Sequence, residues 1–102
     1  MIISRRVNFN VMIKSFKHKG LKKYFETGVS KGLPSSHLRK IAGILDLLDC
    51  SEEVDSFMPF YQCHELKGSR KGICSMIVSG NWRITFEFKE GNAYILNYED
   101  YH

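Results

Sequence analysis

The sequence ends in residues that could carry acid–base chemistry. Asp100 and His102 are two positions apart, at the end of an apolar run that includes Ile95. If this run is a β-strand, side-chain alternation places both on one face together with Tyr98, with about 7 Å between them along the strand. A carboxylate close to an imidazole can orient the ring and raise its pKa into the physiological range. The alternative is a solvated terminus without a function.

Cationic side chains that could hold a phosphate occur in two places. His64, Lys67, Arg70 and Lys71 surround two glycines in the stretch HELKGSRKG, and glycine lets a backbone approach a phosphate closely. Arg83 lies within WRITFEFK, where it would either clamp a phosphate with two N–H groups or form a cross-strand pair. The alternative for the stretch HELKGSRKG is an ordinary solvated turn.

Other side chains give weaker indications. One of Tyr94, Tyr98 and Tyr101 could stack on a base, whereas the aromatic residues of WRITFEFK are expected in the core. The four histidines lack the spacing of metal ligands, and no Ser or Cys has the context of a catalytic nucleophile. We therefore expect no metal and no other cofactor.

Length, composition and charge describe one small domain with an uneven surface. A chain of 102 residues, 43% hydrophobic and 13% aromatic, is sufficient for a single folded core. The formal charge is +4; residues 1–40 carry ten of the fifteen Lys and Arg, and residues 41–65 carry six acids and no Lys or Arg. This distribution indicates a polyanionic partner, or else a solvated charged face.

The sequence predicts a cytoplasmic location. Three cysteines without CxxC spacing are typical of free thiols in a reducing compartment. No run approaches the roughly 18 apolar residues of a membrane span, and the first residues lack the apolar core of a signal peptide. Neither export nor membrane insertion is expected.

The first half of the chain predicts one strand and two helices. Residues 13–16 are expected to form a short strand, and residues 17–32 a helix with a lysine-rich face. Pro34 suits the first turn of a second helix, which has apolar residues at helical spacing as far as Leu48. Residues 1–11 either extend the first strand or form a weakly ordered addition before Met12.

After Pro59 the apolar period changes to two, as expected for an antiparallel meander. The predicted strands are FYQCHEL, ICSMIVSG, WRITFEFK and AYILNYEDYH, with EGN as a hairpin turn. The fold class is thus α+β: a short N-terminal strand and a two-helix hairpin packed on an antiparallel sheet of about four strands. The helices cover one face, and the functional residues are expected on the other, polar face.

Four stretches together carry a family resemblance: MIKSFKHKGLKKYFETG at 12–28, HELKGSRKG at 64–72, VSGNWRITFEF at 78–88 and AYILNYEDYH at 93–102. They are similar to the HigB toxins of bacterial toxin–antitoxin pairs, within the RelE/ParE superfamily. The resemblance is colinear from Met12 to His102. It implies a RelE-like toxin domain over 12–102, preceded by an extension over 1–11.

The resemblance also implies an activity and partners. HigB toxins are ribosome-dependent endoribonucleases that cut mRNA during translation. They are neutralised by HigA, a helix-turn-helix antitoxin, through which alone the pair would contact operator DNA. The implied catalytic residues are His102, Asp100, Lys67 and Arg83, and those contacting RNA are His64, Arg70, Lys71 and Tyr101. The alternatives are a toxin of the same fold that binds gyrase without cutting RNA, and a non-catalytic RNA- or ribosome-binding module.

Overall fold

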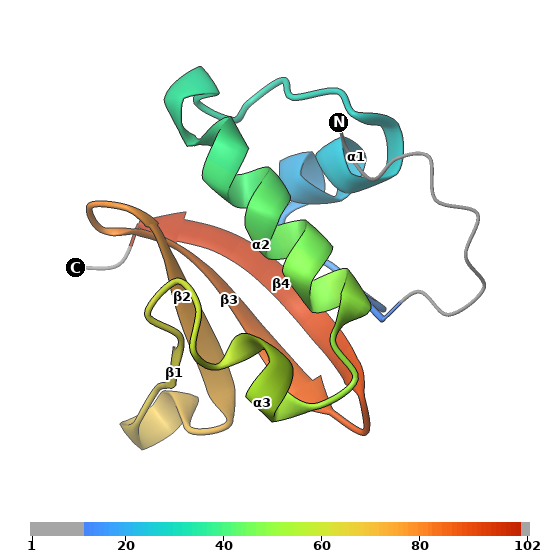
Figure 1. Cartoon of the computed structure of the whole chain (residues 1–102). Coiled ribbons are helices and arrows are strands. Elements are labelled where there is room, and N and C mark those ends of the chain that lie inside the picture. Colours follow the sequence, from blue (N-terminus) through green and yellow to red (C-terminus); the bar gives the residue numbers. More distant parts are fainter. Residues whose placement is uncertain (1–11, 101–102) are drawn as a thin grey trace.

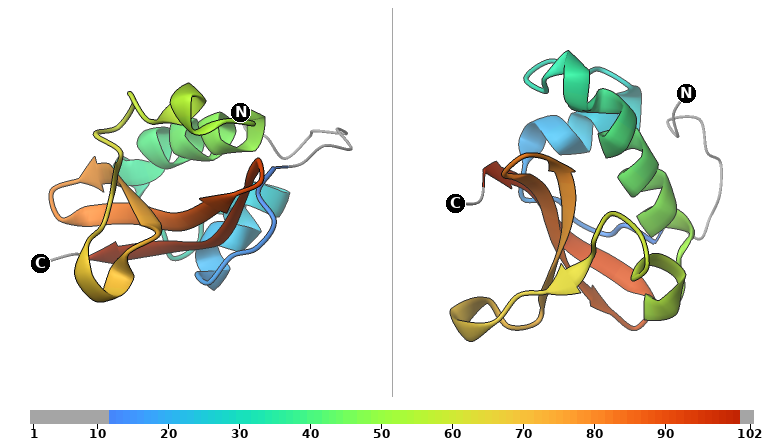
Figure 2. Two further views of the ribbon diagram at one scale, coloured as in Figure 1. Left: turned by 90° about the horizontal axis from the view of Figure 1, so that it is seen from below. Right: turned by 60° about the vertical axis from the view of Figure 1, so that its left-hand side comes forward.

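The computed structural model describes residues 12–100, so the first eleven residues and the pair Tyr101 and His102 lie outside the described residues. The predicted α+β architecture is confirmed, with helices packed on a four-stranded antiparallel sheet. α2 runs across the sheet as a separate layer (Figures 1 and 2). In chain order the elements are α1 (Lys19–Thr27), a 3₁₀ turn (Ser35–His37), α2 (Leu38–Cys50), α3 (Val54–Phe57), β1 (His64–Glu65), a second 3₁₀ turn (Gly68–Arg70), β2 (Ile73–Ser79), β3 (Trp82–Lys89) and β4 (Asn92–Asp100). The predicted boundary between an extension and a domain at Met12 stays a prediction.

The sheet is a meander in the order β1-β2-β3-β4, and all three strand pairs are antiparallel. The turn from β3 to β4 contains Glu90 and Gly91, whose φ angles are +52° and +79°. Two consecutive residues with positive φ are what a tight hairpin turn requires if it is to match the twist of the strands. The predicted EGN turn is confirmed.

One extra residue in β4 decides which side chains face the helices. The pairing of β3 with β4 shifts by one residue between Thr85 and Glu87, and Ile95 of β4 has a φ of +50° at this level. This is a β-bulge, and a one-residue insertion exchanges the two faces for every residue beyond it. Accordingly, the buried side chains occupy odd positions before the bulge, as at Ala93, and even positions after it, as at Tyr98.

The segment predicted as the first strand lies beside β4 as extended chain. It makes two isolated parallel bridges, from Ile13 to Ala93 and from Phe16 to Leu96. The bulge in β4 lies between the two bridged positions, so the ladder between them is interrupted. This segment closes the β4 side of the sheet, and α1 lies next to it (Figure 1).

The helices are shorter than their predicted ranges. α1 begins after His18, whose Nδ1 accepts a hydrogen bond from the Leu21 N–H at 3.0 Å. It ends before Gly28, which has a φ of +83° and caps the helix in the left-handed conformation. Pro34 is extended and precedes a 3₁₀ turn, so α2 starts at Leu38 and not at the proline.

The core lies between α2 and the sheet. Within α2, the apolar stripe predicted from helical spacing is buried at Ile41, Leu45 and Leu48, and Ile44 is buried with them. Burying one such side chain contributes about 1.5–3 kcal/mol. Among the sheet residues in the same cluster are Met76, Val78, Ile84 and Phe86.

Two differences from the predicted elements lie between α2 and β2. The segment after α2, for which no element is predicted, contains the short helix α3. This helix places Phe57 fully buried against Phe86 and Phe88, at ring-centroid distances of 5.5 and 4.8 Å. The strand predicted over FYQCHEL forms only at His64 and Glu65. Tyr61 and Gln62, which belong to the predicted strand, have φ angles of +55° and +52°. These values are incompatible with a strand.

Candidate active site

The open face of the sheet carries a polar cluster at the end of the sheet remote from the β3–β4 turn. Arg83 of β3 lies opposite Glu99 of β4, and the next pair on this face is Thr85 with Asn97. Cross-strand partners have their side chains on the same face, with Cβ atoms about 4.5–5.5 Å apart. The cationic and acidic side chains of this cluster are therefore neighbours across two adjacent strands.

Glu99 is the centre of this cluster. Its Oε1 accepts a hydrogen bond from Nη1 of Arg70 at 3.0 Å, and its Oε2 accepts one from Nη2 of Arg70 at 2.8 Å. Oε2 also accepts from the Thr85 hydroxyl at 2.5 Å and from the Asn97 amide at 3.4 Å. Arg70 belongs to the loop between β1 and β2, and Glu99 belongs to β4 at the other edge of the sheet. This carboxylate therefore connects the predicted basic loop to the opposite edge strand.

These contacts lower the pKa of the Glu99 carboxyl from 4.5 to about 2. The hydrogen bonds from Arg70 are the largest cause, opposed by burial and assisted by Thr85 and Asn97. Hydrogen bonds and a positive charge both favour the ionised form of a carboxyl group. Glu99 is therefore an anion at every physiological pH. Sequence reasoning missed it; the available signal was an acid placed two residues after Asn97 in the last strand.

His64 lies on the same open face, in line with the polar pair formed by Thr85 and Asn97. It is paired with Ser75 of β2, which is itself paired with Thr85. The His64 side chain is exposed, and its Nδ1 lies 3.2 Å from the carbonyl oxygen of Gln62. A carbonyl accepts only from a protonated nitrogen, so this contact favours a proton on Nδ1 and, in the neutral ring, a basic Nε2.

Lys67 and Lys71 line a pocket of about 240 Å³ together with Glu65, Leu66 and Gly68. The two lysines are exposed. The loop that carries them contains left-handed glycines at Gly68 and Gly72 (φ +69° and +96°). The basic loop is thus built around a hollow with cations on its rim, adjacent in the chain to Arg70.

The β-bulge places Asp100 away from Arg83. Asp100 is paired with Trp82, so it shares the face of the core-directed residues, whereas Arg83 is on the open face. The expectation that Asp100 lies on the open face of the sheet is therefore wrong. Tyr98 and Asp100 share one face of β4, as predicted. Tyr101 and His102, predicted to act next to Asp100, lie outside the described residues.

Tyr98 is occupied in the interior and does not offer a ring to a base. It is 6% exposed and stacks on Trp82, with ring centroids 4.7 Å apart and an interplanar angle of 20°. Its hydroxyl lies 2.5 Å from Nδ1 of His37, and its ring packs edge-on against His18. Burial raises the pKa of Tyr98 and lowers the pKa of His18. These contacts fix the end of β4 from which the tail continues.

The three cysteines are free thiols: Cys63 is buried and Cys74 half-buried. A hydrogen bond between the side chains of Cys63 and Cys74 raises the pKa of Cys63, which burial raises further, and lowers the pKa of Cys74. Cys50 is exposed at the end of α2. Within residues 12–100, no group of three or more His, Cys, Asp or Glu side chains is arranged to hold a metal ion.

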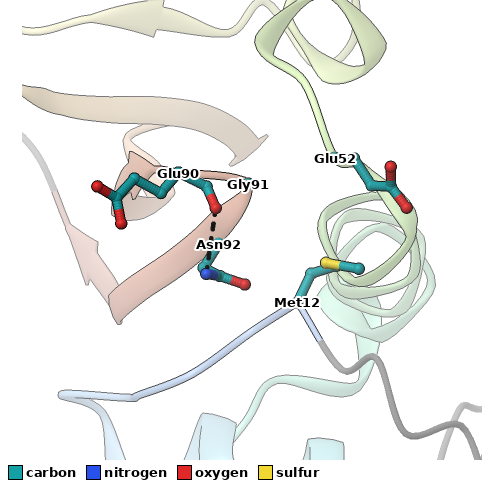
Figure 3. Close-up of a pocket in the computed structure, with 5 residues that line it drawn as sticks. All are labelled: Met12, Glu52, Glu90, Gly91 and Asn92. Atoms are coloured by element: carbon teal, nitrogen blue, oxygen red, sulfur yellow. Dashed lines mark hydrogen bonds between the residues drawn. The ribbon is translucent and has the colours of Figure 1, made fainter.

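A second pocket, of about 380 Å³, lies at the opposite end of the β3–β4 hairpin (Figure 3). It is lined by Met12, Glu52, Glu90, Gly91 and Asn92. Its charged side chains are acidic, and Figure 3 shows the Glu90 carboxylate pointing away from Met12 and Glu52. A surface of this charge repels phosphate, so this pocket is not a candidate for RNA.

The fold and the open face define a class: a small α+β protein with one arginine on an uncovered sheet face and a second arginine and two lysines on the adjacent loop, suited to a polyanion. The profile described as "RelE-like toxin of type II toxin-antitoxin system HigB" matches residues 14–102. The chain therefore belongs to the HigB family of RelE-like toxins, which confirms the family predicted from the sequence.

Two similar proteins are informative to different degrees. Endoribonuclease HigB of Proteus vulgaris is 52% identical over 92 residues, which cover 89% of this chain and 100% of that protein. The endoribonuclease class predicted from the sequence agrees with the name of this relative. The solution structure of the conserved hypothetical protein HP0894 from Helicobacter pylori has a TM-score of 0.46 and 20% identity, and the match covers 87% of this chain and 94% of that one. None of the helices within residues 12–100 is long and apolar enough to cross a membrane.

Proposed function

We propose that this HigB-family toxin is an endoribonuclease that cuts mRNA on the translating ribosome and thereby inhibits protein synthesis and growth. The observation that carries the proposal is the open sheet face on which Arg83 and the Glu99–Arg70 pair are neighbours, in a chain that is similar over nearly its whole length to an endoribonuclease. A guanidinium group is the side chain best matched to a phosphate, because it presents parallel N–H donors.

The proposed reaction uses a nucleophile that the RNA itself supplies. The ribose 2′-oxygen attacks the adjacent phosphorus; a 2′-O–P bond forms and the P–O5′ bond breaks. A base takes the 2′ proton and an acid gives a proton to the leaving 5′-oxygen, so the products are a 2′,3′-cyclic phosphate and a 5′-hydroxyl. Each positioned acid or base contributes about 10²–10⁴-fold, and no metal is required for any of these transfers.

The residue roles follow the chemistry of each side chain. His102 carries the proton transfers, with Asp100 orienting its ring or sharing the transfer. Lys67 and Arg83 stabilise the charge that develops on the phosphate, an effect that can equal or exceed acid–base catalysis.

The remaining contacts hold the RNA. Arg70 and Lys71 extend the cationic surface from the sheet to the loop, His64 contributes a hydrogen-bonding ring on the open face, and Tyr101 stacks on or positions a base. This set of side chains is small for a nuclease. We therefore propose that the ribosome supplies the alignment of the scissile linkage, which is worth several kcal/mol for well-oriented reactants.

The partners follow from the family. A type II toxin requires an antitoxin, and we propose a HigA-like helix-turn-helix protein that binds this chain and alone contacts operator DNA. The site of action, the translating ribosome, places the protein in the cytoplasm.

The test compares mRNA on ribosomes with free mRNA. Purified toxin is added to ribosome complexes programmed with an end-labelled mRNA, and to the same mRNA alone, and the cleavage rate and product ends are measured. We expect cleavage on the ribosome to be at least about 100-fold faster than that of free mRNA, with 2′,3′-cyclic phosphate ends. Comparable rates in the two reactions would contradict the ribosome dependence.

Variants separate an enzyme from a binding module. Arg83→Ala and Lys67→Ala are each expected to slow single-turnover cleavage by about 100-fold or more, while ribosome binding weakens by less than about tenfold. A variant lacking only His102 is expected to fold and to lose growth arrest. If it folds and still arrests growth at full strength, the role of the tail is wrong; if wild-type toxin binds ribosomes but never cuts, the protein is a binding module.

A further inference from the structure

The Glu99 carboxylate has a place in this site that neither the sequence nor the family description assigns. Its side chain is only 21% exposed, and it accepts hydrogen bonds from side chains of the open face and of the basic loop. A carboxylate that only balanced charge on a surface would need one partner. This one accepts four hydrogen bonds from three side chains.

The two hydrogen bonds between Arg70 and Glu99 constrain Arg70 more than they constrain Glu99. Arg70 comes from a loop and has a long, flexible side chain, whereas Glu99 is on a strand and is fixed by Thr85 and Asn97 of the same face. Two parallel N–H···O bonds, at 3.0 and 2.8 Å, set both the position and the plane of the guanidinium group. The Arg70 side chain remains 40% exposed, so its outer surface is accessible to a phosphate.

The position of Glu99 opposite Arg83 gives the contact a second consequence. Two guanidinium groups brought to one part of a sheet face repel each other, and an anion that is paired with one of them and lies opposite the other offsets that repulsion. With the anion in place, both cations can be present before RNA arrives. Positioning of this kind contributes to the rate because the site needs no rearrangement when charge develops on the phosphate.

We propose that Glu99 is a positioning residue of the nuclease site, which holds Arg70 beside Arg83 so that the two guanidinium groups receive one phosphate of the RNA backbone. This inference rests on the proposed endoribonuclease function. Glu99 itself does not touch the RNA and transfers no proton. Its effect is exerted through Arg70.

The test uses Glu99→Gln, which keeps the size of the side chain and removes one of the two paired acceptors. Its control is Glu87→Gln, on the same face of β3, where the carboxylate makes only a long ion pair of 3.8 Å with Lys89. Both substitutions remove one negative charge, so both change the general attraction for RNA equally. Single-turnover cleavage of ribosome-bound mRNA gives kcat, and its dependence on toxin concentration gives KM.

We expect Glu99→Gln to lower kcat by about 10- to 100-fold, the effect of misplacing a group by about 1 Å, with KM changed by less than about threefold. Glu87→Gln is expected to leave both within about twofold. In an Arg70→Lys background, where the paired contact is already lost, adding Glu99→Gln is expected to lower kcat no further. Additive losses would show that Glu99 acts independently of Arg70 and would overturn the proposal.

Thr85→Val gives a second route if Glu99→Gln fails to fold. It has nearly the same shape and removes the hydrogen bond of 2.5 Å to Glu99, so a smaller loss of kcat, about three- to tenfold, is expected. A folded Glu99→Gln or Thr85→Val protein with wild-type or increased kcat refutes the inference. Wild-type toxin that does not cut RNA in the same assay refutes the proposed function, and the two failures are thereby distinguished.

Discussion

The Glu99 ion pair predicts how the stability of this protein depends on pH. The pKa of the carboxyl falls from 4.5 to about 2 on folding, and each pKa unit corresponds to 1.36 kcal/mol. The full difference is therefore about 3 kcal/mol. The Arg70 side chain is 40% exposed, and solvent screens an ion pair of this kind. We expect about 1–2 kcal/mol of pH-dependent stabilisation.

The sign follows from linkage. A carboxyl group with a lower pKa in the folded state binds fewer protons there than in the unfolded state. Its stabilisation is complete above about pH 4.5, the ordinary pKa, and is lost as the pH falls through about 2, the pKa in the folded protein. Between these values the unfolded state takes up the proton first, so acid favours unfolding.

The assay is urea unfolding of the wild-type protein and of Glu99→Gln at several pH values from 7 to 2. Other carboxyl groups titrate over the same range, and the difference between the two proteins isolates Glu99. We expect the wild-type advantage to be constant from pH 7 to about 5 and then to shrink by about 1–2 kcal/mol. Glu87→Gln is the control: its ion pair with Lys89 is longer and more exposed, so it is expected to change stability by less than about 0.5 kcal/mol. A wild-type advantage that stays flat down to pH 2 would refute the assigned pKa of Glu99 and the strength of its pairing.

Three further predictions concern the packing and the thiols. Gly43→Ala places a methyl group against the Tyr61 hydroxyl and is expected to cost about 1–3 kcal/mol in urea unfolding, less in a Tyr61→Phe background. Phe57→Ala removes a fully buried ring and is expected to cost about 3–5 kcal/mol, seen as a lower melting temperature. The Cys74 thiol, whose pKa is lowered, should react with iodoacetamide faster than Cys63, whose pKa is raised, as measured by mass spectrometry; equal rates would contradict the assigned hydrogen bond.

The parts of the fold that follow from local patterns were predictable. Of the aromatic residues of WRITFEFK that are expected in the core, Phe86 is fully buried, and Trp82 and Phe88 are partly buried against the core. Helical spacing up to Leu48 correctly indicated a buried stripe, which contains Ile41, Leu45 and Leu48. The ends of the helices are set by capping, and capping depends on specific contacts that helix propensity does not describe. α1 ends at Thr27 because a single glycine adopts a left-handed conformation, although the helical pattern continues beyond it.

The same limit applies to β1. Tyr61 and Gln62 have ordinary strand propensity, but both adopt a positive φ. Gly43 of α2 leaves room for the Tyr61 hydroxyl, since a Cβ at that position would meet it. The positive φ of Tyr61 is thus associated with a contact to Gly43, which lies 18 residues earlier in the chain. A short stretch of sequence around Tyr61 does not contain this contact, so local propensity could not predict it.

The site shows why a correct strand can still give the wrong face. Counted from the hairpin turn without a bulge, Arg83 would lie opposite Tyr98, and Asp100 would share the open face with it. The extra residue at Ile95 shifts the register by one, so Arg83 lies opposite Glu99. A shift of one residue exchanges the faces of everything that follows. The bulge therefore makes Glu99, and not Asp100, the strand carboxylate that meets Arg70, while Tyr98 turns into the core and fixes the end of β4. Deleting Ile95 would leave Thr85 opposite Asn97 and Arg83 opposite Glu99 in a regular ladder. A strand that kept Ile95 but paired without the bulge would instead turn Tyr98 to the open face and Glu99 toward the core. The bulge is thus as much a part of the site as the side chains that it orients.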